Sequence, residues 1–301
     1  MSISIEQLRY VVLGTRNLEL AAQFALGELG LQSTWRSAEE AAFRADARQY
    51  VLLFNQAEPR RQAVGLQVAD VAALDAANAA LSARGITLHA DPELAARRNV
   101  RALGRFTSAG GMDVELVVRP QDQGWRFHAA RDVGMLGLSA VALRSTDAAA
   151  DEAMWRDVFG LRVSDWVGDA AYLALADGEH HRLSLHPAGS GGVLAVEYQV
   201  EALDQLMQQS YRLVEAGLSP AHGPGRRPTS GQAFVTFDGP DGIYYSFVTE
   251  GERRDQHTAW RPRQFGGGAQ SHCGWGSECR IPELQGKPVP GRASLRGVSS
   301  A

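Results

Sequence analysis

The chain has 301 residues, of which 45% are hydrophobic and 21% are charged, a composition typical of a soluble globular protein with room for two domains. The net charge of −4 gives no reason to expect a nucleic-acid partner. No apolar run is long enough to cross a bilayer, and the first residues lack the basic start and apolar core of a signal peptide. We therefore expect a cytoplasmic protein with no membrane partner, whose Cys273 and Cys279 are free thiols.

A short pattern recurs four times along the chain. Strand-like openings occur at residues 8–13, 63–68, 138–143 and 194–200, and each is followed by a polar turn and a helix-like run. A repeat of this length fixes an architecture before any residue chemistry is considered. The pattern predicts an α+β fold of four βαβββ modules, paired into two domains with concave mixed sheets and with helices on the outer faces.

In the first half, Asn17 is expected to cap a helix over residues 18–29. An alanine-rich helix follows over residues 71–83, and residues 106–108 and 112–118 form a hairpin.

In the second half, Asp147 or Thr146 caps a helix that reaches Phe159. Residues 171–175 and 181–185 are predicted as paired strands, followed by a helical stripe and a last hairpin. The expected organisation is an N-terminal domain over residues 1–120, a linker over 121–134, a C-terminal domain over 135–250, a C-terminal wrap over 251–280 and a disordered tail over 281–301.

Three stretches in the second half carry a family resemblance. These are Asp-Gly-Glu-His-His-Arg-Leu at 177–183, Gly-Pro-Asp-Gly at 239–242 before an apolar strand, and Trp-Arg-Pro-Arg at 260–263 before Gly-Trp-Gly at 274–276. In this order they resemble the vicinal oxygen chelate (glyoxalase/bleomycin resistance/dioxygenase) superfamily. More narrowly, residues 5–277 are similar to the two-domain type I extradiol ring-cleavage dioxygenases of aromatic catabolism.

The resemblance implies a metal site in the C-terminal half. The family holds Fe(II), sometimes Mn(II), by two histidines and one glutamate. The matching positions here are Ala140, Ala195 and Ser246, none of which is a useful iron ligand. The family's pocket histidine and tyrosine are replaced by Gly231 and Thr236. We therefore predict that the protein has no metal ligands and no cofactor.

The N-terminal half is structural in the family that the chain resembles. Its matching positions are Tyr10, Ala63 and Glu115. One carboxylate does not make a metal site, so Glu115 is expected to be an inherited remnant or a surface partner.

Three residues are candidates for catalysis. The resemblance places His181 at the family's acid/base position, and the alternative is a hydrogen-bonded strand histidine. Glu197 and Tyr244 lie two residues from Ala195 and Ser246, and on a strand such positions share a face. Glu197 would then point into the concave site or form a salt bridge. Tyr244 would donate to a phenolic ligand or pack.

The predicted substrate-binding residues line the floor of the same concave face. His186 is expected on the surface and, like His180, on the side away from His181. Trp260, Arg261 and Arg263 would cover the mouth of the pocket, where an arginine could pair with a substrate carboxylate, or would pack between subunits. The substrate-binding set is Ala140, Ala195, Ser246, Thr236 and His180.

Three functions follow from these observations. The first is a metal-independent enzyme that acts on a small aromatic or phenol-derived compound, with His181 moving protons. The second is an Fe(II)-dependent catechol ring-cleavage dioxygenase whose ligands the pattern does not reveal. The third is a non-catalytic protein that binds an aromatic metabolite or assists an active relative. The partners expected are a small aromatic molecule and further copies of the chain in a homo-oligomer.

Overall fold

The computed structural model describes residues 3–253 and 260–285. The N-terminal half contains β1 (Ile5–Gly14), α1 (Leu18–Gly27), β2 (Gln32–Arg36), β3 (Glu40–Arg44), β4 (Leu52–Asn55), β5 (Gln62–Val68), α2 (Val71–Ser82), β6 (His89–Ala90), α3 (Pro92–Arg97), β7 (Ala102–Thr107) and β8 (Asp113–Val118).

The C-terminal half repeats this order and adds a wrap. It contains β9 (Met135–Ser145), α4 (Ala148–Asp157), β10 (Arg162–Val167), β11 (Ala170–Ala174), β12 (Leu183–Pro187), β13 (Gly192–Val200), α5 (Leu203–Glu215), β14 (Pro220–Arg226), β15 (Ala233–Asp238), η1 (Pro240–Gly242), β16 (Tyr244–Thr249), β17 (Arg263–Phe265), α6 (Ala269–His272) and η2 (Pro282–Leu284).

The predicted α+β architecture of four βαβββ modules is confirmed. The first strands of paired modules meet antiparallel at the centre of each sheet, β1 with β5 and β9 with β13. The strand order is β2-β3-β4-β1-β5-β8-β7-β6 in one sheet and β14-β15-β16-β13-β9-β12-β11-β10-β17 in the other. Five of the described elements lie outside the repeat. They are α3, inserted between β6 and β7, η1, inserted between β15 and β16, and the C-terminal β17, α6 and η2, of which β17 pairs with the edge strand β10.

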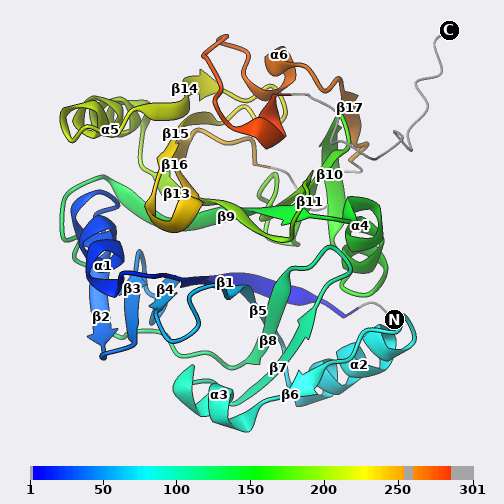
Figure 1. The fold of residues 1–301 in the computed structure, drawn as a ribbon. Coiled ribbons are helices and arrows are strands. Elements are labelled where there is room, and N and C mark those ends of the chain that lie inside the picture. Colours follow the sequence, from blue (N-terminus) through cyan, green and yellow to red (C-terminus); the bar gives the residue numbers. More distant parts are fainter. Residues whose placement is uncertain (1–2, 254–259, 286–301) are drawn as a thin grey trace, which may run out of the picture.

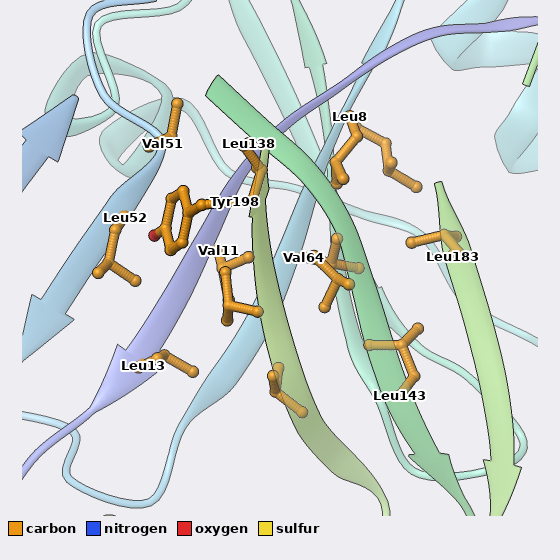
Figure 2. Close-up of a cluster of buried hydrophobic side chains, with 14 of the residues drawn as sticks. Leu8, Val11, Leu13, Val51, Leu52, Val64, Leu138, Leu143, Leu183 and Tyr198 are labelled. Carbon is orange, nitrogen blue, oxygen red and sulfur yellow. The ribbon is translucent and has the colours of Figure 1, made fainter. Parts of the chain in front are cut away.

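The two sheets pack against each other through their convex faces, as Figure 1 shows. One hydrophobic cluster joins both halves, and Leu8, Val11 and Val64 face Leu138 and Leu143 across it (Figure 2). Residues of α1, α2, α4 and α5 belong to the same cluster. The convex faces of the sheets are therefore covered by the helices, as expected, and also form the contact between the two halves. The two concave faces point away from each other.

Helix starts follow the capping residues in the sequence. Asn17 and Asp147 each accept a hydrogen bond from the backbone N–H three residues later, as predicted. Both helices end two residues before the predicted bound, at Gly27 and Asp157, and the chain then reaches a glycine with positive φ.

The prediction of disorder from residue 281 is wrong for residues 281–285. Ile281 is 1% exposed, and Pro282–Leu284 forms a short 3₁₀ helix. Residues 286–301 lie outside the described part of the chain. Among the described residues, no helix is both long and apolar enough to span a membrane.

Candidate functional site: the C-terminal bowl

The candidate site lies on the concave face of the second sheet, which we call the C-terminal bowl. Strands β9, β13, β15 and β16 form its floor, and α6 and η2 lie over it on the side remote from the N-terminal half (Figure 1). The register pairs Glu197 with both Ala140 and Ser246, and Ala195 with Ala142. Side chains on alternate strand positions share a face, so these residues belong to one surface.

The bowl contains a cavity of about 30 Å³, the volume for one or two water molecules. Its floor consists of small side chains, namely Ala142, Ala195, Thr236 and Ser246. Glu197 also lines the cavity. Of the residues predicted from the sequence, Ala140, His180, His181 and Tyr244 are not part of the lining.

Glu197 is held by an arginine on the turn between β14 and β15. Arg227 Nη2 and Nη1 donate to the two carboxylate oxygens at 2.6 and 2.8 Å, a bidentate pair. Glu197 is 4% exposed, and the guanidinium of Arg227 also lies 5.1 Å above the ring of Phe234. Of the two alternatives for Glu197, the structure therefore shows a residue that both lines the cavity and forms a salt bridge.

A row of hydrogen-bonded side chains lies behind the cavity wall. Arg263 Nη2 and His180 Nε2 each contact Asp165 Oδ2 at 2.8 Å, and His180 Nδ1 lies 3.0 Å from His181 Nδ1. Burial raises the pKa of Asp165, but the hydrogen bonds from His180 and Arg263 outweigh it and lower the pKa to about 2. Asp165 is therefore an ionised acceptor, and the proton on this bond belongs to His180 Nε2.

This arrangement connects the two histidines to the cavity wall. One hydrogen bond joins the Nδ1 atoms of His180 and His181, so one ring donates and the other accepts. His181 Nε2 lies 3.9 Å from Glu197 Oε2. Burial, and then the nearby His180 and Arg227, lower the pKa of His181 well below its usual value. His181 is thus a neutral imidazole whose Nε2 faces the carboxylate at the cavity wall.

Three further histidines line the cavity, and sequence reasoning did not select them. His186, His222 and His272 are between 2% and 7% exposed. Burial is the main cause that lowers their pKa values to about 3, 4 and 4 respectively, so all three imidazoles are neutral at pH 7. The prediction that His186 lies on the surface is wrong.

The error at His186 has a structural cause. His181 lies before the strand that begins at Leu183, so its direction does not set the alternation of the strand: Leu183 and Leu185 face the core while Ser184 and His186 face the bowl. His180 and His181 precede the strand and contact each other, so they do not point in opposite directions.

The predicted cover of the mouth lies elsewhere. Trp260 donates to the backbone oxygen of Ser164, and Arg263 pairs with Asp165 at the sheet edge, so neither lines the cavity. Arg261 is exposed and also lies outside the lining. Tyr244 is partly buried and, like Cys279 and Leu284, packs against the hydrophobic cluster that contains Ala195 and Ile281.

The concave face of the first sheet, the N-terminal bowl, contains a different arrangement. Glu115 is fully buried and accepts from Tyr10 Oη at 2.6 Å, Arg61 Nη2 at 2.7 Å and Arg98 Nε at 3.2 Å. It is therefore not a surface partner. Arg98 follows α3, a helix whose Leu94 and Ala95 pack in the hydrophobic cluster of this face.

Comparison with known proteins supports the architecture over the whole chain. Residues 137–247 match the family model "Glyoxalase/Bleomycin resistance protein/Dioxygenase superfamily". The Mn(II)-bound glyoxalase from Novosphingobium aromaticivorans has 23% identity and a TM-score of 0.82, covering 96% of this chain and 97% of its own. BphC, a halotolerant catechol dioxygenase, has 20% identity and a TM-score of 0.83, with coverages of 94% and 97%.

A third solved structure gives the same picture. The 2,2',3-trihydroxybiphenyl 1,2-dioxygenase from dibenzofuran-degrading Sphingomonas wittichii strain RW1 has 19% identity and a TM-score of 0.80, covering 92% of this chain and 100% of its own. No protein with a curated description matches the chain.

The comparisons contradict the prediction that the protein has no cofactor. The glyoxalase of the same fold is Mn(II)-bound, and the other two are dioxygenases, so these relatives point to a metal cofactor. The residues at the expected positions do not fit a metal, because Ala140 and Ala195 have no donor atom. Within residues 3–253 and 260–285, no group of three or more histidine, cysteine, aspartate and glutamate side chains is arranged to hold one.

Both halves of the chain have the fold of these structures, and the second half also matches the family at the level of sequence. Residues 137–247 therefore form a domain of the Glyoxalase/Bleomycin resistance protein/Dioxygenase superfamily.

Proposed function

We propose that the protein is an enzyme that binds a small aromatic or phenol-derived compound in the C-terminal bowl and moves a proton between it and His181. One observation carries the proposal. A buried neutral imidazole, His181, faces a carboxylate that lines a cavity in the concave face of a dioxygenase-like fold.

The residues at the cavity wall can move the proton in two steps. A phenolic hydroxyl at the cavity wall gives its proton to Glu197, which passes it to Nε2 of His181 in the tautomer with its proton on Nδ1. Glu197 then faces an imidazolium, whose Nδ1 contacts the Asp165–His180 pair. The phenolate left behind faces Arg227, the cation that lines the same wall. Proton and charge balance without any further group.

The neutral histidines support a role in ligand recognition. His186 and His222 present ring nitrogens beside the hydroxyl groups of Ser184, Thr236 and Ser246, all of which line the cavity. A small floor with a few polar groups at its edge suits a flat apolar ring that carries hydroxyl substituents.

The test compares ligand binding with turnover in the full-length protein. Calorimetry measures the binding of a panel of phenols and catechols, and chromatography with mass detection measures their consumption. General acid–base catalysis contributes about 10²- to 10⁴-fold. His181→Ala should therefore lose at least about 100-fold in turnover while its affinity changes by less than about three-fold. His89→Ala, which changes an exposed histidine of the other half, is the matched control.

Other outcomes identify the competing functions. Binding without turnover in the unmodified protein would contradict the proposal and indicate an accessory, non-catalytic protein. A ring-cleavage dioxygenase is favoured by its fold relatives. Purified protein with stoichiometric iron or manganese, together with a ring-fission product from a catechol, would establish that second candidate instead.

A further inference from the structure

The mouth of the C-terminal bowl is closed by the chain itself, through residues 279–285, which we call the C-terminal strap. Ile281 of the strap is 1% exposed and packs in a hydrophobic cluster with Ala142, Leu194 and Ala195 of the floor. The backbone N–H of Arg280 donates to the carbonyl of Ala221 at 2.8 Å. The orange to red end of the described chain lies over the second sheet in Figure 1.

The strap also places a carboxylate on an arginine beside the cavity. Glu283 Oε1 accepts from Arg144 Nε at 2.6 Å, and the side chains are 14% and 20% exposed. Arg144 lies on β9 two residues after Ala142, so both share the concave face. The second carboxylate oxygen of Glu283 is buried and has no hydrogen-bond partner among the described residues. The pair is therefore one-sided, unlike the bidentate pair that Arg227 makes with Glu197.

The space beneath the strap is too small for the proposed ligand. A cavity of about 30 Å³ holds water, whereas an engineered cavity that binds benzene has a volume of about 150 Å³. An aromatic ligand enters only where Ile281 and Leu284 now lie, so the strap and the ligand compete for the same position.

We propose that the strap is an internal mimic of the ligand, and that the C-terminal bowl binds aromatic carboxylates whose acid group replaces Glu283 on Arg144. Ile281 and Leu284 occupy the position of the apolar ring, and Glu283 supplies the carboxylate. A ligand carboxylate that reaches Arg144 gains a planar guanidinium that can bind both of its oxygens. It displaces Glu283, whose second oxygen is buried without a hydrogen-bond partner among the described residues. Arg144 is then the residue that selects acids over neutral phenols. This inference rests on the proposed function and adds the substrate class and the device that closes the site.

The experiment uses two probes that differ by one carboxylate, catechol and 3,4-dihydroxybenzoate, with full-length protein and calorimetry. Arg144→Gln should weaken the acid at least about ten-fold and leave catechol within about three-fold. Glu283→Gln should strengthen the acid at least about ten-fold, because the internal competitor is lost. Glu278→Gln, an exposed glutamate just before the strap, is the control and should change neither affinity.

The outcomes separate this inference from the proposed function. Two results would show that the strap does not mimic the ligand, while the proposed binding of an aromatic compound would stand. One is that Arg144→Gln weakens the binding of both probes equally. The other is that Glu283→Gln leaves the affinity for the acid unchanged. Absence of binding of either probe to every variant overturns the proposed function itself. Arg144→Lys serves where Arg144→Gln does not fold, since it keeps the charge but loses the planar fork, and should weaken the acid selectively.

Discussion

The two bowls have the same strand architecture but differ in what fills them. In the N-terminal bowl, α3 supplies apolar side chains and Arg98, and Glu115 is neutralised by long partners from three segments. In the C-terminal bowl, no helix is inserted at the equivalent place, and the floor is made of small residues. A buried glutamate–arginine pair is present in both, so the charge pair alone does not mark a site. The cavity and the neutral histidines around it do.

The largest expected effect is on the stability of the folded protein, when the buried ion pairs of the N-terminal bowl are disrupted. Glu115→Ala leaves Arg98 with one partner, Glu40, at 3.5 Å. Loss of one member of a buried ion pair costs about 3–5 kcal/mol in unfolding free energy. Urea denaturation measures it, and ligand affinity in the other bowl should not change. Glu58→Ala removes an exposed partner of Arg61 and should cost less than about 1 kcal/mol. Similar losses in the two variants would contradict a structural role for the buried network.

A glycine under Tyr10 gives a smaller effect with the same origin. A Cβ at Gly65 would lie 2.4 Å from the Tyr10 ring, so the ring that bonds Glu115 must shift. Overpacking of this kind costs about 1–3 kcal/mol. Gly27→Ala is the matched control, because nothing lies within 4 Å of its Cβ and it ends α1. That change should stabilise by about 0.4–1 kcal/mol. A lower melting temperature for Gly27→Ala than for Gly65→Ala would refute the packing argument.

The smallest effect concerns pH, and it belongs to the C-terminal bowl. His222 has a pKa of about 4 in the folded protein, chiefly because it is buried, against an ordinary value of 6.5. The unfolded chain therefore binds the proton first, and stability falls as pH drops from about 6.5 towards 4. One such histidine gives a slope of about 1.4 kcal/mol per pH unit.

His222→Gln should reduce the measured proton uptake on unfolding between pH 6 and 4.5 by about one proton. Urea denaturation at a series of pH values gives this number. His89→Gln, in the exposed strand β6, should leave the slope unchanged. An unchanged slope for His222→Gln would show that its ring is already protonated in the folded state.

The sequence predicted those parts of the site that strand alternation controls. Ala195, Glu197 and Ser246 lie on regular strands, so the two-residue rule placed them on one face correctly. His180 and His181 precede the strand Leu183–Pro187, so the alternation counted from His181 assigned His186 to the wrong face. A strand boundary is the weakest part of such a prediction, because residues outside the strand do not follow its alternation.

The rest of the bowl comes from segments without periodicity. Arg227 and His272 lie on a turn and on a one-turn helix that have no repeating pattern. The strap is only seven residues long, and only the spacing of Ile281 and Leu284, at the N-cap and the end of a short 3₁₀ helix, signals that it packs. The position of α3 inside the first bowl was likewise invisible, because nothing local distinguishes a helix that fills a concave face from one that covers a convex one.

The attachment of β17 to the sheet edge has a consequence for biosynthesis. Arg263, which holds Asp165 and through it the orientation of His180, is separated from Asp165 by 98 positions in the chain. His272 and Ile281 come later still. A nascent polypeptide can therefore form its first sheet and most of its second before Arg263 has been made, but the imidazole pair is locked in place only after that residue has been added.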